Sequence, residues 1–199
     1  HFMPENLVHY LPLPRLLQQL VSRIAWRDFC SVFEKLDAVT TPTETAASLM
    51  RKVGFHKPIL AISCGIDLSR FNPNLTGDSL RKKYGIPSNK VVFLYVGRLD
   101  REKNVDLLLK AFAKIDRTKS HFLIAGKGHQ MEPLKKLSVD LGITDAVTFA
   151  GFIPDDELAY IYLAADCFII AGTAELQSIV TMEAMASGLP VIGVDAVAL

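Results

Sequence analysis

The sequence predicts a doubly wound α/β domain built on a Rossmann-like parallel sheet. Short, fully apolar segments such as 91–96 alternate with amphipathic segments such as 104–115. Strands that are apolar on both faces lie in a parallel sheet that helices cover on either side. Glycine and proline at the segment ends mark the turns. Such sheets bind ligands at the carboxyl ends of their strands, so chemistry is expected in the strand-to-helix turns.

Two groups of elements are expected, one on each side of a linker. The first group is helix 14–36, strand 38–40, helix 42–53 and strand 58–62. Thr41 and Glu44 fit a capping box with Pro42 at the first helical position. Segment 71–90, rich in Pro, Asn, Gly and Ser, is the predicted linker. The second group is strand 91–96, helix 104–115, strand 121–125, helix 130–141, strand 147–150, helix 155–165, strand 167–171, helix 177–187 and strand 191–194.

The composition excludes several classes of protein. A formal net charge of +1 over 199 residues argues against nucleic acid as a partner, because binding its phosphates needs a basic surface. No apolar run reaches the roughly 18–20 residues that span a bilayer, and no secretory signal is seen. Three distant cysteines, Cys30, Cys64 and Cys167, fit a reducing compartment and no cysteine metal site. We expect a cytoplasmic protein, and its abrupt ends indicate a fragment.

The turn after strand 91–96 carries the first candidate site. Arg98 follows the strand directly, and Lys103 precedes the next helix. Two cations beside the free N–H groups of a helix start can hold a diphosphate. The alternative is a pair of solvated loop charges, partly neutralised by Asp100 and Glu102.

Two further turns offer backbone groups. The segment 126–128 reads Gly-Lys-Gly, which lacks the third glycine of a dinucleotide site and favours a structural turn. In the turn 151–154, the backbone and the ring of Phe152 suit a nucleobase, although ordinary packing explains the ring equally well.

Two glutamates eight residues apart form the strongest candidate. If both are helical, Glu175 and Glu183 share a face about 12 Å apart, too far to share a proton. They suit two ends of one ligand, with the backbone N–H groups of 176–178 facing a phosphate. The alternative is that Glu175 serves the helix dipole and Glu183 lies on a solvated face. Against that alternative, Glu183 stands in a helix that is apolar nearly all round, where a carboxylate needs a partner.

These turns together resemble the group 1 glycosyltransferases (family 4), which have the two-domain GT-B fold. The similar blocks are 64–71, 96–99 with 103–104, 126–128, 149–152, 164–166 and 175–192, which contains the family's Glu-x7-Glu signature. The resemblance implies that 1–69 is the incomplete end of the amino-terminal, acceptor-side domain. It implies that 70–199 is the nucleotide-sugar-binding domain, truncated at its end.

The resemblance also assigns roles to single residues. Arg98 and Lys103, beside Gly97, match the cations on the donor diphosphate. Glu183 matches the carboxylate on the ribose, and Glu175 the one at the hydroxyls of the transferred sugar. The remaining implied positions are Phe152 and Ile153 at the base, Leu176, Gln177 and Ser178 at the phosphate, Gly65 in the cleft turn, and His1, which faces the sugar across the cleft.

The implied activity is a retaining hexosyl transfer. The donor is a nucleotide-diphosphate sugar, UDP- more than GDP-linked, and no cofactor and no metal are implied. The segment around His1 is similar to family members that glycosylate membrane glycerolipids, so the acceptor is a glycerolipid or a saccharide. An expression-tag remnant is the alternative origin of His1.

The sequence departs from the family at two points. Cys64 stands where the family usually has asparagine. Residues 176–178 stand where the family often has Gly-Phe-Gly, so side chains are expected where backbone alone meets the phosphate in other members. Three other functions stay open: a nucleotide-sugar-binding module without catalysis, a sugar-nucleotide epimerase relative, and an NAD-binding domain, the last disfavoured by its glycines.

The first long helix raises a question of membrane contact. It carries Arg15, Arg23, Arg27 and Trp26, which together suit an anionic membrane surface. The alternative is a helix packed on the core, with its arginines in water.

Overall fold

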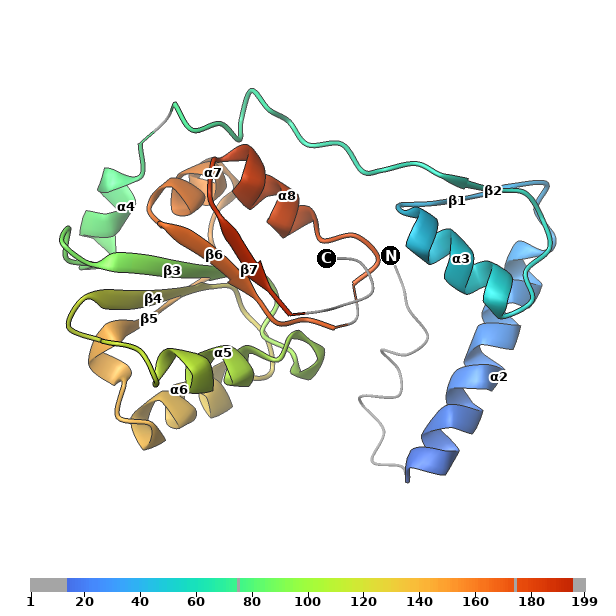
Figure 1. The fold of residues 1–199 in the computed structure, drawn as a ribbon, viewed down its shortest axis with the longest axis horizontal. Coiled ribbons are helices and arrows are strands. Elements are labelled where there is room, and N and C mark those ends of the chain that lie inside the picture. The colour runs from blue at the N-terminus through green and yellow to red at the C-terminus, as the bar shows by residue number, and fades with distance from the viewer. Residues whose placement is uncertain (1–13, 75, 174, 195–199) are drawn as a thin grey trace. The chain divides into compact units, whose positions relative to one another are not determined.

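The computed structural model describes residues 14–74, 76–173 and 175–194, which fall into two compact units (Figure 1). The first unit holds the described residues up to Gly65 together with segment 175–178. The second unit runs from Ile66 to Thr173 and resumes at Ile179.

The first unit is a small α/β layer. Its elements are α2 (Arg15–Phe33), β1 (Val39–Thr41), α3 (Glu44–Lys52) and β2 (Ile59–Ala61). The strands β1 and β2 pair in parallel, and α3 contacts both. Trp26 and Cys30 of α2 are buried in one cluster with Met50 and Phe55. Trp26 is therefore not on the exposed face of α2 that could meet a membrane, whereas Arg23 and Arg27 are exposed.

The predicted capping box of α3 is wrong by two residues. Thr43 is the N-cap, since its hydroxyl accepts a hydrogen bond from the Ala46 N–H at 3.1 Å. Pro42 therefore precedes the helix rather than opening it. Thr41 instead ends the strand β1, which explains why its side chain is buried.

The second unit is built on one parallel sheet of five strands. They are β3 (Val91–Val96), β4 (Ser120–Ala125), β5 (Val147–Gly151), β6 (Cys167–Ile170) and β7 (Val191–Gly193). Their order is β5-β4-β3-β6-β7, and every pair is parallel. Within this unit the chain thus forms the middle strand β3 first, adds β4 and β5 on one side, and then adds β6 and β7 on the other. The carboxyl ends of β3 and β6 flank the switch point, where doubly wound sheets bind ligands.

Helices cover both faces of this sheet (Figure 1). On one face lie α4 (Asp78–Lys83), α7 (Asp155–Leu163) and α8 (Ile179–Ala186); on the other lie α5 (Val105–Phe112) and α6 (Met131–Asp140). Alternate residues of β3 serve the two cores: Leu94 packs with the first group and Tyr95 with the second. Two single 3-10 turns, Arg101–Lys103 and Thr144–Ala146, complete the unit. The predicted α/β fold class is confirmed.

The predicted linker 71–90 is wrong. This segment contains α4, and three of its apolar side chains, Phe71, Leu80 and Ile86, are buried in the core of the second unit. Arg81 fixes it further by donating to the Ala164 carbonyl at 2.8 Å and to Asp166 at 2.8 Å. Turn-forming residues dominate the composition, but the buried positions decide the structure.

Candidate functional site

The turn after β3 lies at the switch point of the sheet. Asn104 ends the 3-10 turn with a left-handed backbone (φ 51°), and asparagine tolerates that conformation better than most residues. Its Nδ2 donates to the Ala171 carbonyl, just after β6, at 3.0 Å. This bond ties the two turns that flank the switch point to each other.

Arg98 is held by two buried carboxylates. Its guanidinium bonds Asp100 at 2.7 Å and Glu102 at 3.0 Å, while its own side chain is 64% exposed. The structure therefore contains the pairing of Arg98 with Asp100 and Glu102 that the alternative interpretation of this turn predicted. The pairing does not bury the guanidinium: it fixes one edge and leaves most of its surface open to a ligand. Lys103, half-buried, ends the same 3-10 turn.

The Gly-Lys-Gly turn packs backbone to backbone against the turn after β3. A Cβ on Gly126 would lie 1.8 Å from the Gly97 carbonyl oxygen, and one on Gly128 would lie 2.3 Å from that of Leu99. The Leu99 N–H donates to the Lys127 carbonyl at 2.9 Å. Both glycines are thus required by close packing, which is the structural role predicted for them.

The turn after β5 exposes an aromatic ring. Phe152 is 67% exposed, and the Lys127 ammonium lies 5.7 Å from its ring centroid. The neighbouring Ile153 is buried in the core. The buried Ile153 fixes the turn while the ring of Phe152 stays in solvent, so ordinary core packing does not explain the ring.

Glu183 has the partner that its apolar helix requires. The Tyr162 hydroxyl, from α7, donates to Glu183 Oε2 at 2.6 Å. Burial raises the pKa of Glu183, and the bond from Tyr162 and the charge of Arg70 act against this rise. The same burial, next to the Glu183 charge, raises the pKa of Tyr162 far above its ordinary value, so the phenol stays a donor.

Arg70 stands on a turn built by Asp67. The Asp67 carboxylate accepts from the Ser69 N–H at 2.9 Å and from the Ser69 hydroxyl at 2.6 Å. These bonds lower the pKa of Asp67 and fix the turn. Arg70 then bonds Asp155, at the start of α7, through both its carbonyl and its carboxylate. The sequence block 66–71 therefore places a cation near Glu183.

Segment 175–178 differs from its prediction. The helix α8 begins at Ile179, so Glu175 precedes it and the helical spacing of the two glutamates does not apply. The Gln177 amide accepts from the Cys64 N–H at 2.9 Å and donates to the Ser63 hydroxyl at 2.6 Å. Thr43 donates to the Leu176 carbonyl at 3.1 Å. These contacts place the segment in the first unit, with Gly65, while Glu183 belongs to the second.

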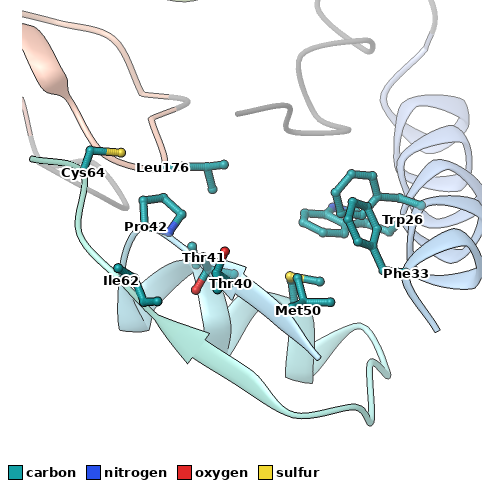
Figure 2. Close-up of a pocket in the computed structure, with 12 residues that line it drawn as sticks. Trp26, Phe33, Thr40, Thr41, Pro42, Met50, Ile62, Cys64 and Leu176 are labelled. Carbon is teal, nitrogen blue, oxygen red and sulfur yellow. The ribbon is translucent and has the colours of Figure 1, made fainter. Parts of the chain in front are cut away.

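A pocket of about 390 Å³ lies in the first unit beside Leu176. Figure 2 shows Trp26 and Phe33 on one side and Met50 and the Thr40–Thr41 strand on the other. Its described lining is apolar apart from two threonines and Cys64.

One predicted site residue, His1, cannot be placed. His1 lies outside the described residues. Within 14–74, 76–173 and 175–194, no group of three or more His, Cys, Asp or Glu side chains could hold a metal ion. No helix among the same residues has the length and hydropathy of a membrane span.

Sequence reasoning missed Tyr162 and Arg70. Both act on Glu183 but lie 21 and 113 residues from it along the chain, so no local sequence pattern links either of them to Glu183. The only signal was the prediction that a carboxylate in an apolar helix requires a partner.

Comparison with known proteins gives these features a family. Residues 77–198 match the family model described as glycosyl transferases group 1. An alpha-monoglucosyldiacylglycerol synthase of Streptococcus pneumoniae is 34% identical over 200 residues, 96% of this chain and 44% of the relative. Anabaena HepE in complex with UDP-glucose has a TM-score of 0.79 at 23% identity, over 88% of this chain and 50% of that one.

A second solved structure gives the same fold. Sucrose-phosphate synthase from Thermosynechococcus elongatus has a TM-score of 0.75 at 26% identity, over 97% of this chain and 48% of that one. The chain thus spans about half the length of these proteins. The chain belongs to the group 1 glycosyltransferase family.

Proposed function

We propose that the protein transfers a hexose, with retention, from a nucleotide-diphosphate sugar to an acceptor. The observation that carries this proposal is a fixed, exposed cation at the ligand-binding edge of the sheet, in the same unit as a fixed carboxylate. Arg98 is fixed but exposed beside the switch point, and Glu183 is fixed on a helix of the same unit. HepE, the structural neighbour described above, binds UDP-glucose, which supports a UDP-linked donor.

Each proposed role follows from the chemistry of the side chain. Arg98 and Lys103 neutralise charge that develops on the leaving diphosphate, an electrostatic effect that is often the largest in catalysis. Glu183 accepts hydrogen bonds from the ribose hydroxyls, and Glu175 from hydroxyls of the transferred sugar. The exposed turn at Phe152 and Ile153 receives the base. His1 completes the catalytic set from the proposed amino-terminal domain 1–69, and 70–199 is the proposed donor domain.

The proposed acceptor is a membrane glycerolipid, with a saccharide as the second candidate. The Streptococcus pneumoniae relative is named for the synthesis of a glucosyl diacylglycerol, which supports the lipid. Arg23 and Arg27 are exposed on α2 and suit the surface of anionic lipid. Replacing both with glutamate should reduce sedimentation with anionic liposomes, and unchanged sedimentation would remove membrane contact from the proposal.

The two glutamates give the direct test of the proposed function. In the natural full-length chain, Glu183→Ala should raise the dissociation constant of UDP by about 100-fold, because a charged hydrogen-bond acceptor is lost. Glu175→Ala should mainly lower kcat for transfer from UDP-glucose. Glu132→Ala, an exposed glutamate on α6, is the control. Wild-type values for both donor binding and turnover in the two test variants would overturn the assignment.

The same measurements separate transfer from binding alone. Residues 1–199 and the full-length chain are each titrated with UDP, GDP and their sugars, and each is assayed for transfer. Binding by both with transfer by neither would favour a binding module. An epimerized free sugar nucleotide would favour the epimerase relative.

A further inference from the structure

The hydroxyl of Tyr162 is a fixed donor inside the second unit. Its ring is fully buried, with a relative exposure of 0%. The ring of Phe71 packs edge-to-face against it with centroids 5.9 Å apart, and the ring of Phe168 packs at a tilt with centroids 6.0 Å apart. A phenol enclosed in this way keeps a single orientation, so its bond to Glu183 Oε2 has a defined direction.

Glu183 keeps acceptor capacity beyond this bond. A carboxylate has two oxygens and about four acceptor positions, of which Tyr162 uses one. Among the residues that the structure describes, no donor is hydrogen-bonded to Oε1. The side chain is half-buried, so water reaches it only in part. A half-buried anion with one oxygen held and one available suits a ligand that brings hydroxyl donors.

Charges from two other elements act on this carboxylate. Arg70, on the Asp67 turn, attracts it, and Asp155, at the start of α7, repels it. Arg70 is itself bonded to Asp155, which ties its guanidinium to the start of α7. Tyr162, Arg70 and Asp155 are the charged or titratable groups that act on Glu183 within the described residues. Of these, only Tyr162 contacts the carboxylate by a hydrogen bond.

We propose that Tyr162 is a positioning residue of the donor site, which holds one oxygen of Glu183 so that the other faces the vicinal hydroxyls of the ribose. This inference rests on the proposed function, because it takes Glu183 as the ribose acceptor. It adds that discrimination between ribose and deoxyribose depends on a residue that never touches the nucleotide. The fixed phenol selects the carboxylate orientation that fits the diol.

The test compares the affinity of UDP with that of 2′-deoxy-UDP by calorimetry in the full-length chain. Tyr162→Phe keeps the ring and its packing but removes the hydroxyl. We expect UDP to bind about 10- to 30-fold more weakly, the size of a hydrogen bond to a charged group. We expect 2′-deoxy-UDP to change much less, so that the preference for ribose shrinks. Tyr160→Phe, on the exposed side of the same helix, should change neither.

A pH series adds a readout that loss of structure would not produce. The Tyr162 bond opposes the rise of the Glu183 pKa, so its removal should leave more of the carboxyl protonated in weak acid. The loss of UDP affinity relative to wild type should therefore be larger at pH 6 than at pH 8. Glu183→Asp, which keeps the charge but withdraws it from Tyr162, should show the same dependence.

The outcomes are distinguishable. If wild type binds no UDP, the proposed function fails. If wild type binds UDP but Tyr162→Phe keeps the ribose preference and the wild-type pH profile, the positioning role is overturned and the proposed function stands. Should Tyr162→Phe fail to fold, Glu183→Asp decides the question, and wild-type preference and pH profile in that variant would overturn the role.

Discussion

The two ends of the five-stranded sheet use charged residues in opposite ways. At the amino end, Arg81 bonds the Ala164 and Lys90 carbonyls and Asp166, and Asp166 also accepts from the Val92 N–H at 2.7 Å. At the carboxyl end, Arg98 bonds two buried acids and still remains mostly exposed. Pairing at the amino end uses the charge for the fold. Pairing at the carboxyl end orients a charge and leaves it available.

The largest expected effect is at the carboxyl end. Arg98→Ala should lower kcat for transfer from UDP-glucose by about 100- to 1,000-fold, the range seen when one donor to a developing oxyanion is removed. The assay is run below the midpoint temperature of unfolding of the variant, because Asp100 and Glu102 lose this partner and the fold loses stability with it. Arg101→Ala, an exposed arginine of the same 3-10 turn, should stay near wild type. Equal losses in the two variants would mean that Arg98 acts only through net charge.

At the amino end, the expected effect is on stability alone. Arg81→Ala removes donors from two carbonyls and one carboxylate, and it should lower the free energy of unfolding by about 2–3 kcal/mol. Urea denaturation measures this loss. The dissociation constant of UDP should stay within about twofold, in keeping with the purely structural role. A rise in that constant comparable to that of Glu183→Ala would break the distinction between the two ends.

A histidine at the amino end makes stability depend on pH. His121, at the start of β4, bonds Thr148 at 2.9 Å, and its Nδ1 is buried without a partner among the described residues. Burial and the Lys90 charge lower the pKa of His121 from 6.5 to about 4. The unfolded chain therefore binds the proton more readily, so stability is full above pH 6.5 and falls as the pH falls toward 4.

Between pH 7 and pH 5, His121 should account for a loss of about 2 kcal/mol in the free energy of unfolding. His121→Gln, which keeps a hydrogen bond to Thr148, should remove that share of the loss. Denaturation of both proteins at the two pH values measures the difference. An identical pH dependence in the variant would show that other groups cause it.

The smallest expected effect concerns segment 175–178. Gln177→Ala removes the bonds to the Cys64 N–H and the Ser63 hydroxyl, and kcat should fall about fivefold because Glu175 loses a support on its own segment. Steady-state kinetics with UDP-glucose measures the change, with Gln19→Ala on α2 as the control. A fall as large as that of Arg98→Ala would place Gln177 among the residues that contact the donor.

The sheet was predictable because each strand is a short apolar run that can be recognised from its own residues. The apolar run 91–96 coincides with β3, and the periodicity of 104–115 contains α5. The errors occur where distant contacts decide. Leu80 and Ile86 make 71–90 part of the core, which its turn-rich composition concealed. The start of α8 at Ile179 was missed because the preceding residues bond segment 63–64, more than 110 residues away. The Tyr162–Glu183 bond joins two helices, so periodicity within either gives no sign of it.

The bond from Asn104 to the Ala171 carbonyl has a consequence for the cost of binding. Together with the close packing of Gly126 on the Gly97 carbonyl, it joins the turns after β3, β4 and β6 before any ligand arrives. These turns therefore lose their conformational entropy when the chain folds, and not when a ligand binds. A nucleotide that binds there keeps more of its contact energy as affinity. Its association should also leave the backbone amides of these turns little changed in hydrogen exchange.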